Sequence, residues 1–256
     1  MSEFLIDNQN EKIETVNENI RLISKKDGLT FGTDAYLLAA YISASPSALA
    51  VDLGSGTGIL PLLLLARNKI QRAIAVEVQK DFCDLIARNA SLNGESERIR
   101  ALHLDVRALP SPLLTAECAD VVLSNPPYMT VDSGKPNPSD AKFIARHEVC
   151  GDISDFCRAA ASTLKYGGKF YCVYRPDRLV DLLTAMRHHK LEPKRMTLVH
   201  ATVGATPSMA LIEAKKGAAP SLTLTRPLIL TDGDGRQSTD AAHIYETCSF
   251  EDFFKR

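Results

Sequence analysis

A proline-rich tetrapeptide is the part of the sequence whose residue types fit a chemical step most directly. Residues 125–128 read Asn-Pro-Pro-Tyr and follow the apolar segment ADVVLS, which has the composition of a strand. An aromatic or amide NH2 group is a poor nucleophile because its lone pair is delocalised, so group transfer to it requires two acceptors that hold its N–H groups and aim the lone pair. The side-chain oxygen of Asn125 and the main-chain oxygen of Pro126 can be those acceptors, since the prolines stiffen the turn. Tyr128 can stack on a planar substrate, whereas a plain turn at Pro126 and Pro127 would explain neither the asparagine nor the tyrosine.

A glycine-rich segment predicts a binding site for a nucleotide-like ligand. Residues 51–60 read VDLGSGTGIL, in which a buried strand leads into a loop and then into an apolar helix. The loop glycines let the backbone pass close to a ligand, and the helix N-terminus offers unpaired N–H groups; these glycines are Gly54, Gly56 and Gly58. Dinucleotide folds use the different spacing G-x-G-x-x-G, and the carboxylate of Asp52 would repel a pyrophosphate. An acid there suits a ligand with a positively charged end, such as the amino group of S-adenosylmethionine (SAM).

Two further carboxylates follow the next two predicted strands. Glu77 closes the segment AIAVEV and is placed to accept from both ribose hydroxyls of such a cofactor, and Asp105 in HLDV could accept from the exocyclic amine of its adenine. Ligands of open α/β sheets collect at the carboxyl ends of the strands, so acids at three such ends can converge on one cleft. One acid at a strand end is more often a helix cap or a solvated group, but the ordered set with the glycine loop favours a cofactor site.

The rest of the chain supplies the elements that would position these residues. Short aliphatic runs alternate with helical stretches, which predicts a parallel sheet covered by helices on both faces. The predicted strands are residues 48–53, 73–78, 99–106, 119–124, 169–174, 195–201 and 208–215. The predicted helices are residues 80–93, residues 153–166 with a stop at Gly167-Gly168, and a segment from Pro176 to about Lys190.

Segments of a different character flank this α/β core, which we place at residues 48–216. Residues 1–47 predict a short hairpin around residues 26–28 and then a helix from Thr33 or Asp34 through Ile42. Residues 217–256 form a C-terminal extension with a strand-like segment and an exposed turn rich in Gly and Asp.

Composition narrows the class of protein. The chain has 256 residues, 45% of them apolar, and 30 lysines and arginines against 31 acids, so its net charge is −1. A protein that wraps a long duplex would carry a large basic excess, so any nucleic-acid contact here must be local. The six cysteines include no C-x-x-C pair, which indicates reduced thiols and neither a disulfide framework nor a metal site. Because the sequence contains neither a signal peptide nor an apolar run of about 18 residues, we expect a cytoplasmic protein.

These motifs together resemble one known family. Beyond the glycine loop and the tetrapeptide, the resemblance extends to DGLTFGTDAYLLAAY (27–41), ARHE (145–148), GGKFYCVYRPDRL (167–179) and LEPKRMTLVHA (191–201). The chain resembles class I SAM-dependent methyltransferases of the N-P-P-Y type and, more narrowly, the bacterial tRNA(Val) adenine-N6 methyltransferases, which modify the adenine next to the anticodon. The resemblance implies a Rossmann-like fold with a seven-stranded, mostly parallel sheet, helices on both faces and an antiparallel last strand.

The resemblance also implies roles for individual residues. Thr33 and Asp34 would lie over the cofactor, and the acids and glycines named above would bind it. Asn125 would adjoin the cofactor and hold the target together with Pro126 and Tyr128, and residues 129–146 would form a mobile loop near the substrate. The candidate contacts to tRNA phosphates are Lys135, Lys142, Arg146, Arg175, Arg178, Lys194 and Arg195.

The sequence leaves two alternatives open. A protein glutamine N-methyltransferase would present a similar pair of amide hydrogens to the tetrapeptide, and a non-catalytic SAM- or RNA-binding module could keep the same fold. The FGTDAYLLA segment and the lack of an N-terminal helical substrate-binding domain favour RNA, and the intact tetrapeptide argues against a non-catalytic module. We therefore predict methyl transfer from SAM to the N6 amine of a tRNA adenine, which leaves S-adenosylhomocysteine.

Overall fold

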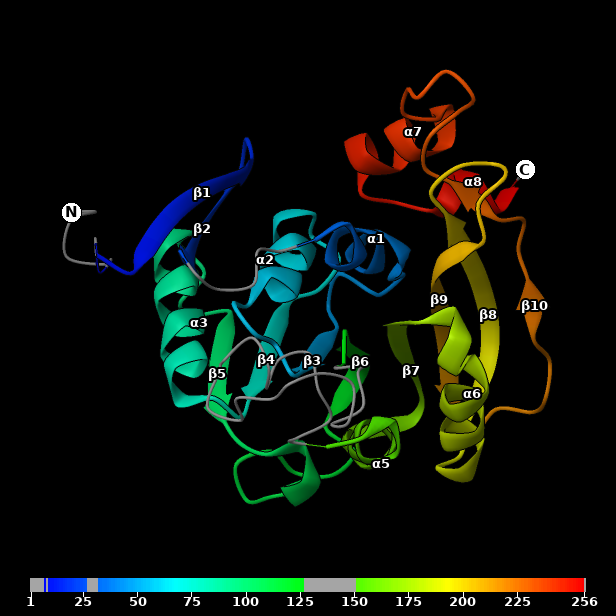
Figure 1. Ribbon diagram of the computed structural model, residues 1–256. Coiled ribbons are helices and arrows are strands. Elements are labelled where there is room, and N and C mark those ends of the chain that lie inside the picture. The colour runs from blue at the N-terminus through cyan, green and yellow to red at the C-terminus, as the bar shows by residue number, and fades with distance from the viewer. Residues whose placement is uncertain (1–6, 8, 27–31, 127–150, 256) are drawn as a thin grey trace, which may run out of the picture.

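A nine-stranded sheet forms the centre of the computed structural model, which describes residue 7 and residues 9–26, 32–126 and 151–255 (Figure 1). Seven of its strands follow the order β5-β4-β3-β6-β7-β9-β8, and all are parallel except β9, which is antiparallel to both β7 and β8. Their bounds are β3 (Leu49–Leu53), β4 (Arg72–Glu77), β5 (Ile99–His103), β6 (Ala119–Ser124), β7 (Leu164–Tyr174), β8 (Leu191–His200) and β9 (Pro207–Lys216). The predicted seven-stranded sheet with an antiparallel last strand is confirmed.

Two short strands from the C-terminal extension complete the sheet. They are β10 (Thr223–Leu224) and β11 (Leu228–Ile229), and both pair parallel with β8 at the outer edge. Two-residue strands carry too little pattern for prediction, so the sequence indicated only a strand-like segment here.

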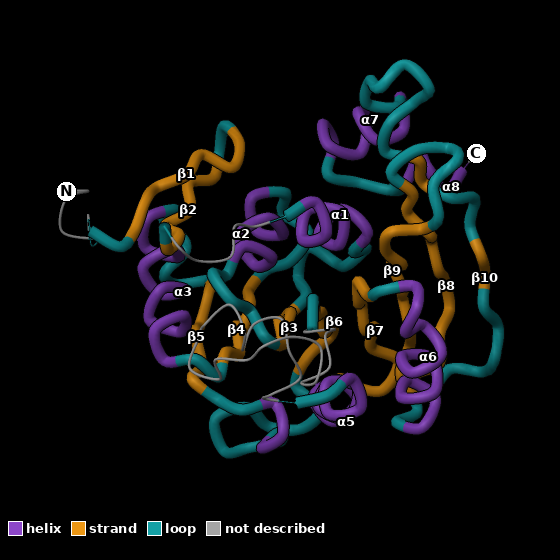
Figure 2. Tube along the Cα trace, viewed as in Figure 1, coloured by secondary structure: helices purple, strands orange, loops and turns teal. Residues whose placement is uncertain are grey.

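Helices cover both faces of the sheet (Figures 1 and 2). Alternate residues of β6 show the two faces: Val121 and Leu123 pack into the core beneath α1 and α2, while Val122 packs on the opposite side with α5 and α6. The helices of the central unit are α1 (Thr33–Tyr41), α2 (Ile59–Ala66), α3 (Lys80–Leu92), α5 (Ile153–Thr163) and α6 (Leu179–His188), with short 3-10 turns at η1 (Val106–Ala108) and η3 (Pro176–Arg178). No helix in the described residues is long and apolar enough to cross a membrane.

An antiparallel hairpin of β1 (Glu11–Asn17) and β2 (Ile20–Lys25) docks against α3. The prediction placed a hairpin around residues 26–28, and this was wrong, because the turn that joins the strands lies at residues 18–19, where the side chain of Asn17 accepts from the backbone N–H of Asn19 (2.9 Å). The Asp-Gly signal that led to the error includes residues 27 and 28, which lie outside the described residues.

The helix predicted over residues 153–166 is shorter than expected. It ends at Thr163, and the chain continues directly into β7, so Gly167 and Gly168 lie inside a strand and are not a helix stop. A Cβ atom at Gly168 would lie 3.0 Å from the carbonyl oxygen of Asp120, next to an irregularity in the pairing of β6 with β7. The glycine is therefore required for the close approach of two strands.

The C-terminal extension ends in two helices that the sequence did not predict, α7 (Thr239–Thr247) and α8 (Glu251–Lys255). The hydroxyl of Tyr36 in α1 donates to the carbonyl of Tyr245 in α7 (2.6 Å). Phe250 and Phe254 contact the ring of Tyr41 at centroid distances of 5.2 and 5.6 Å. The extension therefore packs on α1.

Candidate active site

The glycine loop turns over the carboxyl ends of β3 and β4. The backbone N–H groups of Gly54 and Ser55 both donate to the carbonyl of Val76 in β4 (2.9 and 3.0 Å), which bends the chain sharply after β3. Gly54 and Gly58 have φ values of +73° and +81° and lie against Phe156 and Ile86, so side chains at these positions would be strained. The loop thus leads its backbone into the N-terminus of α2, as predicted.

Glu77 lies at the end of β4 and is tied to this loop. Its two carboxylate oxygens accept from the backbone N–H groups of Gly56 and Gln79, each at 2.9 Å. The side chain is buried, and this burial raises its pKa above the usual range despite those hydrogen bonds. Its carboxylate is therefore fixed beside the loop, where the ribose of a nucleotide cofactor was expected.

Asp52 is completely buried beneath the loop. One carboxylate oxygen accepts from the hydroxyl of Ser55 (2.6 Å), and the other has no hydrogen-bond partner among the residues that the structure describes. Burial raises the pKa of this carboxyl to about 7, and the nearby charge of Glu77 adds to the effect. Because Asp52 has no exposed surface, its contact with the amino group of a ligand stays a prediction.

Asp105 lies two residues beyond the end of β5, where it caps the short turn η1. Its carboxylate accepts from the backbone N–H of Arg107 (2.8 Å) and from that residue's guanidinium (2.6 to 3.0 Å). These hydrogen bonds lower the pKa of Asp105. This is the helix-cap arrangement common for acids at strand ends, and recognition of an adenine by Asp105 stays a prediction.

Asn125 follows β6 and is held close to the glycine loop. The hydroxyl of the preceding residue, Ser124, is buried and donates to the carbonyl of Leu53 at the end of β3 (2.8 Å), which ties the two strand ends together. The side-chain Nδ2 of Asn125 donates to the carboxylate of Asp34 in α1 (2.8 Å). Asp34 and Asn125 are both predicted site residues, but no sequence pattern indicates their contact. Ser124 was not predicted, and its only signal is that a polar residue closes an apolar strand.

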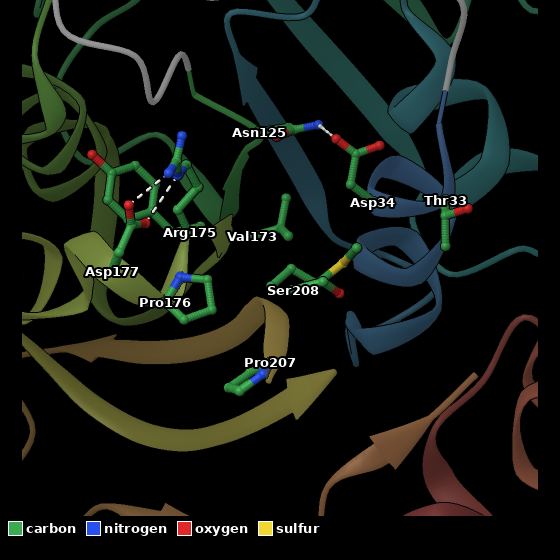
Figure 3. Close-up of a pocket in the computed structure, with 11 residues that line it drawn as sticks. Thr33, Asp34, Asn125, Val173, Arg175, Pro176, Asp177, Pro207 and Ser208 are labelled. Carbon is green, nitrogen blue, oxygen red and sulfur yellow. Dashed lines mark hydrogen bonds and ion pairs between the residues drawn. The ribbon is translucent and has the colours of Figure 1, made fainter. Parts of the chain in front are cut away.

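Asp34 and Asn125 line a pocket of about 640 Å³ (Figure 3). Thr33 and Asp34 border it from α1, and the ends of β7 and β9 form its other walls, with the lining residues Val173, Tyr174, Arg175, Pro176, Asp177, Pro207, Ser208 and Met209. No residue of the glycine loop lines it. The structure places Thr33 and Asp34 at the pocket beside Asn125, and their position over the cofactor stays a prediction.

The predicted RNA contacts fall into three groups. Lys135, Lys142 and Arg146 lie outside the described residues, as do Pro127 and Tyr128 of the tetrapeptide. Arg175 lines the pocket and pairs with Asp177 (2.6 Å), and Arg178 lies close by in η3.

Lys194 and Arg195 do not reach the pocket edge. They lie in the first half of β8, whose carboxyl end is at His200. Lys194 donates to the carbonyl of Ala219 (3.0 Å), and Arg195 pairs with Glu213 and stacks on Phe254 (3.9 Å from the guanidinium carbon to the ring centroid). Both side chains thus hold the C-terminal part of the chain.

The sheet order, the glycine loop after the central strand and the acid at the end of the neighbouring strand define the class I SAM-dependent methyltransferase fold. Within this class, the chain belongs to the methyltransferase small domain family, whose model matches residues 24–188. An enzyme of this class takes its methyl group from SAM.

Individual relatives agree with this assignment. The chain is 33% identical to a tRNA1(Val) (adenine(37)-N6)-methyltransferase of Tolumonas auensis over 173 residues, which covers 64% of this chain and 70% of the relative. It is 30% identical to the protein of that name in Phocaeicola vulgatus, with 69% and 72% covered. The crystal structure of a predicted O-methyltransferase from Agrobacterium tumefaciens superposes with a TM-score of 0.69 at 23% identity and covers 85% of this chain and 97% of that chain, which supports the fold.

Proposed function

We propose that the protein transfers the methyl group of SAM to the N6 amine of an adenine in tRNA, the adenine next to the anticodon of a valine tRNA. The observation that carries this proposal is the position of Asn125 at the wall of a pocket large enough for a nucleoside, beside the carboxyl ends of the central strands. The names of the relatives supply the substrate class. A tRNA substrate would place this activity in the cytoplasm.

The residues around the glycine loop fit SAM. The carboxylates of Asp52 and Glu77 lie beneath and beside the glycine loop, and acids at these positions suit a cofactor with an amino group and a free ribose better than one with phosphates. Gly54, Gly56 and Gly58 would let the loop backbone approach the ligand. Thr33, Asp105 and Asn125 stay predicted cofactor contacts, whereas Asp34 contacts Asn125. We regard residues 48–216 as the catalytic core and residues 1–47 and 217–256 as accessory segments.

The tetrapeptide would prepare the acceptor amine. Asn125 Oδ1 and the carbonyl of Pro126 each accept one N–H of the adenine N6 group, so that its lone pair points away from the ring plane and toward the cofactor cleft. Bound SAM supplies an electrophilic methyl group on its sulfonium. No strong base is required, because the amine becomes acidic only after methylation and its proton can pass to water. Tyr128 would stack on the base.

Contact with RNA would be local. Arg175 and Arg178 stand at the pocket and next to it, and the net charge of −1 leaves no general attraction for polyanions. Lys135, Lys142 and Arg146 remain candidates for the same surface. An adenine in an anticodon loop is already single-stranded and can enter a pocket at small unstacking cost.

The decisive test combines nucleoside analysis with one variant. Mass spectrometry of nucleosides from purified valine tRNA should show N6-methyladenosine lost in a strain that lacks this protein and restored by the wild-type chain. In vitro, Asn125→Ala should lower kcat by about 100-fold or more while the Kd for SAM stays near the wild-type value. Asn19→Ala, in the exposed turn of the hairpin, is the matched control and should retain full activity. Unchanged N6-methyladenosine in the deletion strain would refute the tRNA assignment, and methylation of a protein glutamine would support the amide-modifying alternative.

A further inference from the structure

We propose that Asp34 is a positioning residue that locks the side-chain amide of Asn125 in the one orientation that can hold an acceptor NH2 group. The inference rests on the proposed function, because it explains how the oxygen of Asn125 comes to face the substrate amine and accept its hydrogen bond. It differs from the role that the resemblance implied for Asp34, which was contact with the cofactor.

The chemistry of the pair fixes the orientation. A carboxylate can only accept hydrogen bonds, so the atom of Asn125 that lies 2.8 Å from Asp34 must be the amide nitrogen. The amide oxygen then necessarily points the other way. No described residue donates a hydrogen bond to that oxygen, which is therefore available to an N–H of the substrate. Without the carboxylate of Asp34, the amide of Asn125 could rotate and present its N–H groups to the substrate, and these would repel the N–H groups of the amine.

The carboxylate of Asp34 is itself held in place. Its second oxygen accepts from the backbone N–H of Ala35 (2.9 Å). A Cβ atom at Gly32 would lie 2.6 Å from this oxygen, so only glycine leaves room for the carboxylate where it stands. Gly32 therefore helps to position Asp34, although it lines no part of the pocket and does not contact Asn125.

The helix that carries Asp34 is rigidly packed. Seven of the nine residues of α1 are buried. The ammonium of Lys69 donates to the carbonyls of Ala39, Ala40 and Ile42 at its C-terminal end (2.9 to 3.0 Å), and Tyr36 ties it to α7. Asp34 thus reaches Asn125 from a fixed backbone, which is what a positioning group requires.

The negative charge of Asp34 adds a second effect. A hydrogen bond from the Asn125 amide to a carboxylate polarises the amide and makes its oxygen a stronger acceptor. This effect grows in importance as positive charge develops on the substrate nitrogen during transfer. Asp34→Asn keeps the size of the side chain but removes the charge, and because an asparagine can donate as well as accept, it also removes the bias between the two amide orientations.

The test compares Asp34→Ala, Asp34→Asn and Gly32→Ala with Asp81→Ala. Asp81 is the matched control, because it is also the second residue of a helix and lies exposed on α3, paired with Lys25. We expect Asp34→Ala and Gly32→Ala to lower kcat by about 10- to 100-fold and Asp34→Asn by about 10-fold, with the KM for tRNA and the Kd for SAM within about 2-fold of wild type. Asp81→Ala should keep the wild-type kcat.

A spectroscopic readout separates orientation from activity. The 15N–1H signal pair of the Asn125 side chain, assigned by its loss in Asn125→Ala, should show one proton shifted downfield in the wild type, and this shift should vanish in Asp34→Ala. Wild-type kcat in Asp34→Ala, or a raised Kd for SAM with unchanged kcat, would overturn the inference. If the wild-type protein failed to methylate adenine in tRNA, the proposed function would fail instead, and the NMR signals would still report whether the amide is locked.

Discussion

Asn89 joins the N-terminal hairpin to the glycine loop through one buried side chain. Its Oδ1 accepts from the backbone N–H of Ile23 (2.7 Å), and its Nδ2 donates to the carbonyls of Ile23 (3.1 Å) and Thr57 (2.9 Å). The side chain has no exposed surface. Asn89→Ala would leave three backbone groups without partners where water does not reach, at about 1–3 kcal/mol for each unpaired group. We therefore expect the free energy of unfolding to fall by about 3 kcal/mol or more, a large part of a total of about 5–15 kcal/mol.

The same helix offers a matched control. Asn93, the C-cap residue of α3, accepts from the backbone N–H of Arg21 and donates to its carbonyl (3.0 and 2.7 Å), but these hydrogen bonds are exposed. Water can replace the side chain there, so Asn93→Ala should cost only about 0.5–1.5 kcal/mol.

Urea denaturation of both variants measures the two losses. Amide hydrogen exchange shows where each substitution acts, and Asn89→Ala should lower protection in β2. Because Thr57 lies in the glycine loop, Asn89→Ala should also weaken SAM binding. Asn93→Ala should leave SAM binding intact. Equal losses of stability in the two variants would refute the argument from burial. If Asn89→Ala lowered the free energy of unfolding as expected but left the SAM affinity unchanged, the hairpin would not stabilise the glycine loop.

Three further predictions concern Asp52, Arg175 and Arg195. Because burial raises the pKa of Asp52 from 3.8 to about 7, the folded protein keeps a proton that the unfolded chain releases, so the contribution of this group to stability falls as pH rises from 3.8 to about 7. Asp52→Asn should therefore gain stability relative to the wild type across that range in urea titrations, and a difference that does not change with pH would contradict the raised pKa. Arg175→Ala should weaken tRNA binding and reduce the slope of log affinity against log salt by about 0.7, as expected for one phosphate contact to a single strand. Arg195→Ala should instead lower thermal stability with unchanged tRNA affinity, because Arg195 pairs with Glu213 and Phe254; the opposite pattern would return Arg195 to the RNA surface.

The sequence predicted the central sheet well because its strands are short aliphatic runs between clear helix and turn signals. It failed where a local signal had a different structural cause. The pair Gly167-Gly168 looks like a helix stop, yet it serves the close approach of β7 to β6. The turn of the hairpin at residues 18–19 contains no glycine and was passed over for an Asp-Gly pair.

The site was predictable in its residue types but not in its contacts. Asp34 and Asn125 are separated by 91 positions, so no local pattern could reveal that one orients the other. Asn89 left a weaker trace, since it interrupts the apolar face formed by Phe82, Leu85 and Ile86 at helical spacing. A buried polar residue at such a position requires partners, and these lie in two segments that are 66 and 32 positions away.

The two accessory segments brace different halves of the site. The hairpin acts on the glycine loop through Asn89 and the carbonyl of Thr57. The C-terminal helix α7 acts on α1 through Tyr36, and α1 presents Asp34 to Asn125. Loosening the hairpin should therefore weaken cofactor binding, while loosening α7 should slow the transfer itself. Such a division follows from the hydrogen bonds, because Asn89 in α3 joins the hairpin to the glycine loop after β3, whereas Tyr36 joins α7 to the helix that carries Asp34.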